Sequence, residues 1–271
     1  MAHAPEGPPP VEGGVHATWL GHSTVLLDLG GLRLLTDPLL RPRLGGLTRR
    51  RDLPVHRHVD EVDVVLLSHL HHDHADLPSL RRLGHVPVIT DPANTAWVDR
   101  QGLQVAEASH RQWDPVGPGV EVLLVRADHK ARPMPHRPNG ATGMLVRGAG
   151  VVVWFAGDTS LHPEMELLPE LAGARIDLAL LPIGGWGPRL SAGHMGPTEA
   201  AEAAARVDAR HVLGIHYGTL HPSGWPSSRL DWTTAPGRRL VEVVPHRSDA
   251  VAHVPPVGGA VTVLPSTSGR P

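Results

Sequence analysis

Residues 68–74 read Ser-His-Leu-His-His-Asp-His and follow an apolar run that is typical of a buried strand. Side chains two positions apart in an extended chain point to the same side, so His69 and His71 can converge on one ion. Asp73 and His74 come after the turn and can face a second position nearby. Imidazoles and a carboxylate at this spacing are the ligands that a divalent metal needs. The competing interpretation is a polar surface loop in a chain that contains 20 histidines.

The composition excludes several classes of protein. Cysteine is absent, which rules out disulfides, thiolate metal ligands and cysteine nucleophiles. The formal net charge is −2, so no global field attracts nucleic acid or an anionic membrane. Aromatic residues make up only 3% of the chain, and basic patches with interleaved aromatics are missing. No apolar run approaches the roughly 18 residues of a transmembrane helix.

The length of 271 residues and the apolar content of 41% suit one large domain. We expect it to occupy residues 15–264, between a flexible Pro/Gly-rich leader of residues 1–14 and a frayed tail of residues 265–271. The leader lacks the basic and apolar regions of a secretory signal, so a cytoplasmic location is expected.

Apolar runs and turn residues predict a strand-rich chain with interposed helices. Strands are expected at residues 15–20, 24–29, 32–36, 86–90, 120–125, 151–156, 178–182, 212–215, 241–244 and 261–264. Helices are expected after a cap at Asp76, at residues 92–101 and at residues 198–206. Periodicity alone does not choose among the possible layered arrangements.

More candidate residues stand where these strands end. His129 follows one strand, with His136 as its local rival, and His216 follows another. Asp158 follows a strong strand, and the preceding glycine allows a close backbone approach, which suits a carboxylate that bridges metals. Taken alone, Gly-Asp-Thr is also a common turn and helix cap. Asp37 ends the third strand, where it could simply be a turn residue.

Several stretches together resemble one family. They are His-x-His-x-Asp-His at 69–74, Gly-His-Ser at 21–23, Thr-Asp-Pro at 36–38, LPIGGWGPR and HMGPTEAAEAA between 181 and 204, and IHYGTL at 215–220. This set resembles the metallo-β-lactamase superfamily, in particular its N-acylphosphatidylethanolamine phospholipase D-like and ascorbate-6-phosphate lactonase-like branch. The resemblance spans residues 18–219 and implies an α+β four-layer αββα sandwich. No lipid-binding segment of the phospholipase type is recognisable at the N-terminus.

The resemblance also implies a site for two divalent metal ions, with zinc expected and manganese or iron as alternatives. The implied ligands are His69, His71 and His129 for one metal, Asp73, His74 and His216 for the other, and Asp158 between them. Asp37 would hold a ligating imidazole in one tautomer. His194 would contact the substrate or transition state, unless it only caps a helix at the surface. His22 and Arg132 would add further substrate contacts.

The predicted function is a dinuclear metal-dependent hydrolase that attacks with a metal-bridging hydroxide, because two ions about 3.5–4 Å apart bring the pKa of a shared water toward neutrality. Asp73 would orient this nucleophile and pass its proton to the leaving group. A phosphodiester, a phospholipid-like molecule or a lactone is the expected substrate, small or lipid-like, and the oligomeric state is open. One alternative is a non-catalytic or regulatory metal-binding protein. A diiron redox module is the other, although such relatives usually replace a histidine of the first motif, whereas His71 is present.

Residues 39–60 are expected to form a basic loop. In the resembled family this segment borders the mouth of the active site, so its arginines could hold a phosphate or could simply be solvated. These arginines are Arg41, Arg43, Arg49, Arg50, Arg51 and Arg57.

Overall fold

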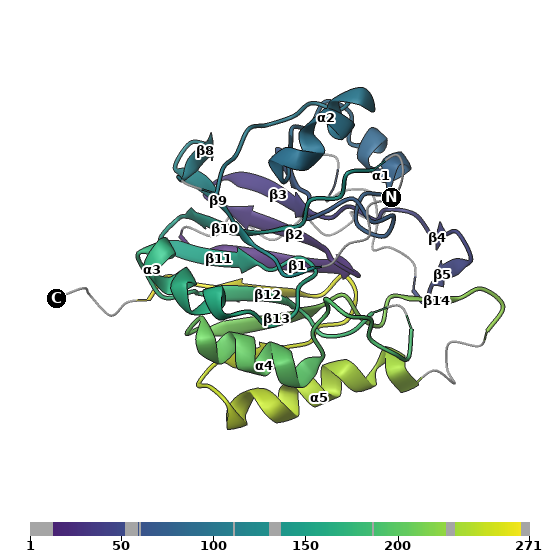
Figure 1. Cartoon of the computed structure of the whole chain (residues 1–271). Coiled ribbons are helices and arrows are strands. Elements are labelled where there is room, and N and C mark those ends of the chain that lie inside the picture. The colour runs from purple at the N-terminus through teal and green to yellow at the C-terminus, as the bar shows by residue number, and fades with distance from the viewer. Residues whose placement is uncertain are drawn as a thin grey trace, which may run out of the picture.

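Two β-sheets lie face to face and carry helices on their outer faces in the computed structural model of the chain (Figure 1). The structure describes residues 13–51, 59, 61–110, 112–129, 137–185, 187–225 and 231–266. The two facing sheets with helices outside confirm the expected αββα sandwich. This arrangement arises because each sheet has one face to bury against the other sheet and one face to bury under helices.

The first sheet joins the N-terminal strands to the last strand of the chain. Its order is β16 (Ala260–Val263), β1 (Val15–Gly21), β2 (Thr24–Leu29), β3 (Leu32–Thr36), β6 (Val64–Leu66) and β7 (Val88–Ile89). Successive side chains alternate between its faces. Val25 and Leu27 therefore pack in the core between the sheets, while Leu26 packs in a separate cluster under the outer helices.

The second sheet mixes parallel and antiparallel pairs. Its order is β15 (Val251–His253), β13 (His211–Ile215), β12 (Leu178–Pro182), β11 (Val151–Phe155), β10 (Thr142–Gly148), β9 (Val120–Arg126) and β8 (Asp114–Gly117). Strands β11, β12, β13 and β15 run parallel, so their carboxyl ends reach the same edge of the sheet. Strands β3 and β6 of the first sheet are also parallel. These shared edges are where the polar segments lie.

Helices α1 (Leu77–Arg82) and α2 (Pro92–Arg100) cover the first sheet, and α4 (Pro197–Arg206) and α5 (Ala235–Val243) cover the second, with the short α3 (Leu168–Ala172) beside it (Figure 1). As expected, Asp76 caps α1 by accepting a hydrogen bond from the backbone of Ser79. Short 3-10 turns lie at Pro163–Leu167, Asp231–Thr233 and Val244–His246. None of the helices in the described residues is long and apolar enough to cross a membrane.

Two local predictions are wrong. Residues 241–244 were expected to form a strand, but they end α5 and begin a 3-10 turn. Pro236 looks like a strand breaker in sequence, yet it stands in the first helical turn, where proline costs nothing, and the helix buries Leu240 and Val243. Residues 39–60 were expected to be a loop, but they include β4 (Arg43–Leu44) and β5 (Leu47–Arg49), which form a small third sheet with β14 (Leu220–Pro222).

Candidate metal centre

Polar side chains from distant segments meet at the edge where the parallel strands end. They form overlapping groups, and within each group the ligand atoms lie within 4.8 Å of one another. The members are His22, Asp37, His69, His71, Asp73, His74, His129, Asp158, His194 and His216. These are the residues that the sequence predicts, except for Arg132, which lies outside the described residues. His136, the local rival of His129, also lies outside them.

The first group consists of His69, His71 and His129. The Nδ1 atom of His71 lies 2.9 Å from Nε2 of His69 and 3.2 Å from Nε2 of His129. Burial, followed by the neighbouring His129, lowers the pKa of His71 to about 4. Burial also lowers the pKa of His69 and His129, so the three rings are neutral imidazoles with converging nitrogen atoms, which is the state that binds a metal.

The second group consists of Asp73, His74 and His216. The Nε2 atoms of both histidines lie 3.7 Å from Oδ2 of Asp73. His22 approaches the same carboxylate oxygen from the buried side, with its Nε2 atom 2.9 Å away. The side chain of Asp73 is 16% exposed, whereas that of His22 is 1% exposed, so Asp73 has an open side and a supported side.

Asp158 lies between the two groups. Its Oδ2 atom is 3.1 Å from Nε2 of His74, 3.3 Å from Nε2 of His216 and 3.9 Å from Nε2 of His69. The backbone can bring it there because Gly157 has φ +62°, and a Cβ at this glycine would lie 2.7 Å from the Cβ of Ser68. A single carboxylate thus faces imidazoles of both groups.

Hydrogen bonds from the surrounding residues orient the rings. The Nδ1 atom of His74 lies 2.6 Å from Oδ2 of Asp37, and Asp37 also accepts hydrogen bonds from the backbone and hydroxyl of Ser68. His129 and His216 each place Nδ1 2.9 Å from a backbone carbonyl oxygen, at Gly193 and Gly184 respectively. A carbonyl can only accept, so Nδ1 carries the hydrogen and Nε2 turns a lone pair toward the centre.

The backbone is strained at three of these positions. His22, Asp37 and His216 have φ angles of 53°, 32° and 57°, in the left-handed region that non-glycine residues seldom adopt. Strained residues of this kind persist where the surrounding structure fixes them, commonly at functional sites. Here the strain turns each side chain toward the edge where the strands end.

The chemistry of the donor atoms fits divalent cations. Among the described residues, Nε2 of His74, Nε2 of His216 and Oδ1 of Asp158 are buried and make no hydrogen bond, which is costly for polar atoms without another partner. Burial alone would lower the pKa of His74, but the carboxylates of Asp158, Asp73 and Asp37 raise it well above its ordinary value. The pocket therefore attracts positive charge, and its nitrogen and oxygen ligands suit zinc, manganese or iron.

His194 stands beside the centre and not at a helix cap. Its Nε2 atom lies 3.2 Å from Oδ2 of Asp158, and its side chain is 13% exposed. The N-cap of α4 is Gly196, whose backbone N–H donates to the side chain of Glu199. The alternative interpretation of His194 as a helix-capping residue therefore does not match the geometry.

A groove of about 540 Å³ opens next to Asp73. Its walls include Leu44 and Leu47 from the β4–β5 hairpin and Leu77 from the start of α1. Arg41 lines it too, but its guanidinium is paired with Asp76. The sequence gives no sign of this wall, because the hairpin lies in a segment with little apolar periodicity.

The basic residues of this segment have separate roles. Arg49 is only 7% exposed, and its guanidinium donates to the backbone carbonyls of Leu20, Leu39 and Arg41. Burial lowers its pKa to about 10. Arg50 and Arg51 line a different pocket. Arg57 lies outside the described residues.

Two residues that hold the loop with the candidate ligands at 69–74 are absent from the sequence-based predictions. Asn139 accepts a hydrogen bond from the backbone of Leu70 at 2.6 Å, and Arg137 donates to the carbonyl of Leu70 at 2.7 Å. Arg137 also lies over the ring of Trp97, 4.7 Å from its centroid. The sequence does not reveal these contacts, because they depend on tertiary structure.

Comparisons with known proteins show the family and the fold. The family model described as a beta-lactamase superfamily domain matches residues 32–217. N-acyl-phosphatidylethanolamine-hydrolyzing phospholipase D 1 of Caenorhabditis elegans is 29% identical over 262 residues, which cover 88% of this chain and 72% of that protein. A metal-dependent hydrolase of Thermococcus onnurineus is 32% identical over 215 residues, which cover 77% of this chain and 87% of that protein. The solved structure of Igni18, a metallo hydrolase from Ignicoccus hospitalis, shares the fold with a TM-score of 0.71 and 24% identity, over 92% of this chain and 97% of that one.

Proposed function

The chain belongs to the beta-lactamase superfamily and is a metal-dependent hydrolase, and from this premise we propose that it works with two divalent metal ions on a phosphodiester. Zinc is the expected metal, and manganese or iron would fit the same ligands. The observation that carries the proposal is the position of Asp158, whose Oδ2 atom faces His74 and His216 at 3.1 and 3.3 Å and His69 at 3.9 Å. A shared carboxylate between two sets of imidazoles suits a site for two neighbouring metal ions.

The ligands divide into two sets and one shared residue. His69, His71 and His129 would hold one ion, Asp73, His74 and His216 the other, and Asp158 both. When bound, the ions would lower the pKa of a water toward neutrality and polarise a phosphoryl or carbonyl oxygen. Burial lowers the pKa of the first three histidines and so keeps them neutral, while Asp37 and backbone carbonyls fix the orientation of several rings of the centre.

Asp73 is the residue that we assign to proton transfer. It borders the groove, so it can accept the proton of the attacking water and pass it to the leaving group. His22 lies on its buried side at 2.9 Å and holds the carboxylate in place. His22 was predicted to contact substrate, but its buried ring suits a positioning role better.

His194 is the candidate for stabilising negative charge that develops on the substrate. It is partly exposed at the centre, 3.2 Å from Asp158, and that carboxylate raises its pKa against the opposing effect of burial. A histidine that keeps its proton can donate to an oxygen that gains charge in the transition state. Arg132 is kept as a further predicted substrate contact.

The lining of the groove supports a substrate with an apolar part. Three leucines and Pro78 border the groove beside Asp73. The Caenorhabditis elegans relative is named for hydrolysis of a phospholipid, which combines a phosphodiester with apolar chains. We therefore favour a phosphodiester with an apolar substituent, and a lactone is the next class to examine.

The test compares Asp73→Asn with Asp99→Asn, which changes an exposed aspartate on α2 in the same way. The substrates are bis(p-nitrophenyl) phosphate, a short-chain phosphatidylethanolamine derivative and an aliphatic lactone. Asp73→Asn should reduce kcat about a thousandfold or more while the circular dichroism spectrum stays unchanged. Near-normal turnover by Asp73→Asn, or faster turnover of the lactone than of both phosphodiesters in the unmodified protein, would contradict the proposal.

A further inference from the structure

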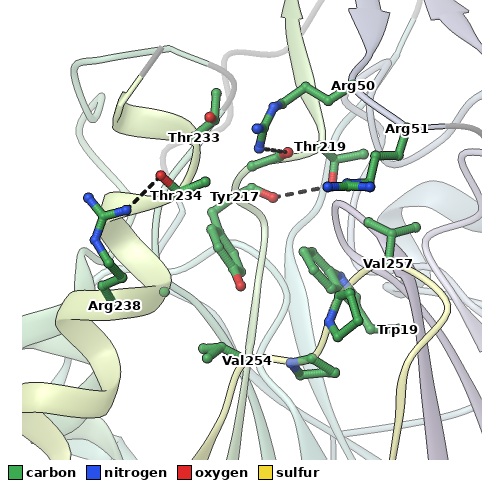
Figure 2. A pocket seen from close by; sticks show the side chains of 14 residues that line it. Trp19, Arg50, Arg51, Tyr217, Thr219, Thr233, Thr234, Arg238, Val254 and Val257 are labelled. Carbon is green, nitrogen blue, oxygen red and sulfur yellow. Dashed lines mark hydrogen bonds between the residues drawn. The ribbon is translucent and has the colours of Figure 1, made fainter. Parts of the chain in front are cut away.

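A second pocket, of about 290 Å³, is lined by Trp19 near the end of β1 and by Tyr217 just after β13 (Figure 2). Its walls come from the end of β1, the segment after β5, the segment after β13, the start of α5 and the loop at residues 254–257. None of the candidate metal ligands lines it. Its volume is near the lower end of the range for small-molecule sites.

One side of the pocket is aromatic and apolar. The rings of Trp19 and Tyr217 are stacked, with centroids 5.1 Å apart and an interplanar angle of 7°. Figure 2 shows the Tyr217 side chain between α5 and the loop that carries Val254. Both rings line the pocket, and the phenol of Tyr217 adds a hydroxyl group that can donate or accept a hydrogen bond. Val257 and the neighbouring prolines complete this apolar side.

The opposite side is cationic. Arg50 and Arg51 both line the pocket, and no aspartate or glutamate is among the described residues that line it. The Nε atom of Arg50 is buried and makes no hydrogen bond in the described part of the chain. Its Nη1 atom donates a 3.3 Å hydrogen bond to the carbonyl of Gly218. Arg238, by contrast, is paired with Asp231 at 2.7 Å and serves as an internal comparison.

This combination favours an anion. The pKa of Arg50 is lowered by burial and then by the charge of Arg51, so the charged form of the Arg50 guanidinium is destabilised by its surroundings. A guanidinium presents its N–H groups as a planar fork, which matches the oxygens of phosphate, sulfonate or carboxylate groups. An anion placed here would offset the repulsion and supply an acceptor for the unbonded Nε.

We propose that this pocket binds a small amphipathic anion, with its phosphate, sulfonate or carboxylate group at Arg50 and Arg51 and its apolar body over Trp19 and Tyr217. The site is separate from the metal centre but is connected to it by hydrogen bonds. Thr219 accepts from the backbone N–H of His22 at 2.6 Å, and the indole of Trp19 donates to the His22 carbonyl at 2.9 Å. A ligand in this pocket would contact Trp19 and Thr219, which hold the backbone of His22, and would not touch the candidate metal ligands.

The probe is naphthalene-2-sulfonate, because a sulfonate is a weak metal ligand and naphthalene supplies an apolar body. Its binding to the metal-loaded protein is measured by calorimetry, with inorganic sulfate and neutral 2-methylnaphthalene as partial probes. The variants are Arg51→Gln and the double variant Arg50→Gln/Arg51→Gln. The matched control is Arg43→Gln/Arg81→Gln, which removes two exposed charges that do not line the pocket.

The expected result is one saturable site whose affinity falls about tenfold in Arg51→Gln and further in the double variant, as expected for charge-assisted hydrogen bonds, with no change in the control. Both partial probes should bind more weakly than the complete one. Arg51 is exposed, so its replacement leaves folding intact. Equal affinity in the double variant, no saturable binding, or equally tight binding of the neutral probe would overturn the proposal. Asp73→Asn should retain the binding, so failure of the hydrolase proposal would not affect this result.

Discussion

At the scale of single residues, the candidate site depends on how each side chain is held. His22 illustrates this, because its ring contacts Asp73 at 2.9 Å while its backbone is bonded by Trp19, Thr219 and His216. A residue held on several sides transmits that rigidity to its neighbour. The alignment of Asp73 is therefore expected to depend on His22.

Replacing His22 with asparagine should lower kcat about 10- to 100-fold, with a small change in KM, because the support of Asp73 is lost while the groove is unchanged. His85→Asn, at an exposed position in the described chain, is the control and should behave like the unmodified protein. The measurement is steady-state kinetics together with metal content. A rise in KM at constant kcat would show that His22 binds substrate directly, as the sequence first suggested.

Gly157 is a second residue on which the centre depends. Gly157→Ala should lower the free energy of unfolding by about 1–2 kcal/mol because of the left-handed backbone. The contact of the new Cβ with Ser68 should lower it by about 1–3 kcal/mol more. Gly173 has nearly the same φ, +65° against +62°, but nothing within 4 Å of its Cβ position. Gly173→Ala should therefore lose only the first contribution. Urea unfolding measures the loss of stability in both variants. Equal losses of unfolding free energy would show that the close contact at Gly157 does not affect stability.

At the scale of elements, the sequence predicts the strands well because they are buried and apolar. The run at residues 178–182 becomes β12 with the same bounds, and the candidate ligands do follow strand ends. The end of the chain is predicted poorly. There Pro236 was taken as a breaker, although its position in the first turn of α5 is compatible with a helix. Whether a proline starts or stops an element depends on packing that the sequence does not show.

The pairing of β13 with β15 gives a pH-dependent contact away from the metal centre. His211 pairs with Val251 and His253 pairs with Leu213, so the two histidines are diagonal neighbours, with Nδ1 of His211 3.0 Å from Nε2 of His253. Burial lowers the pKa of both, and the neighbouring histidine contributes to the shift at His253. The unfolded chain therefore binds protons more readily, so the stability from this pair is present above a pH of about 6.5 and is lost as the pH falls below it.

The free energy of unfolding should accordingly decrease between pH 7.5 and pH 5, and His253→Gln should reduce the decrease. Urea unfolding at both pH values measures the effect, and His85→Gln controls for loss of an exposed histidine. A decrease of the same size in His253→Gln and in the unmodified protein would show that this pair does not titrate on unfolding.

At the scale of the whole molecule, two sheets bring strand ends from both halves of the chain to one edge. The residues at 69–74 could be predicted because their types and spacing carry the chemistry of metal binding, and the other residues of the candidate site were implied by the family resemblance. The groove and the cationic pocket could not, since each is formed by segments far apart in sequence. Arg50 and Arg51 were grouped with the mouth of the active site, but the fold directs them to the second pocket.

The central claim is that the chain holds two metal ions around Asp158, and elemental analysis of metal per chain tests it most directly. Protein saturated with zinc and freed of excess by desalting should contain about two ions per chain, and His71→Ala and His216→Ala should each contain about one. These two variants affect different sets of ligands, so each should keep the ion of the other set. One ion or none in the unmodified protein after saturation would contradict the account.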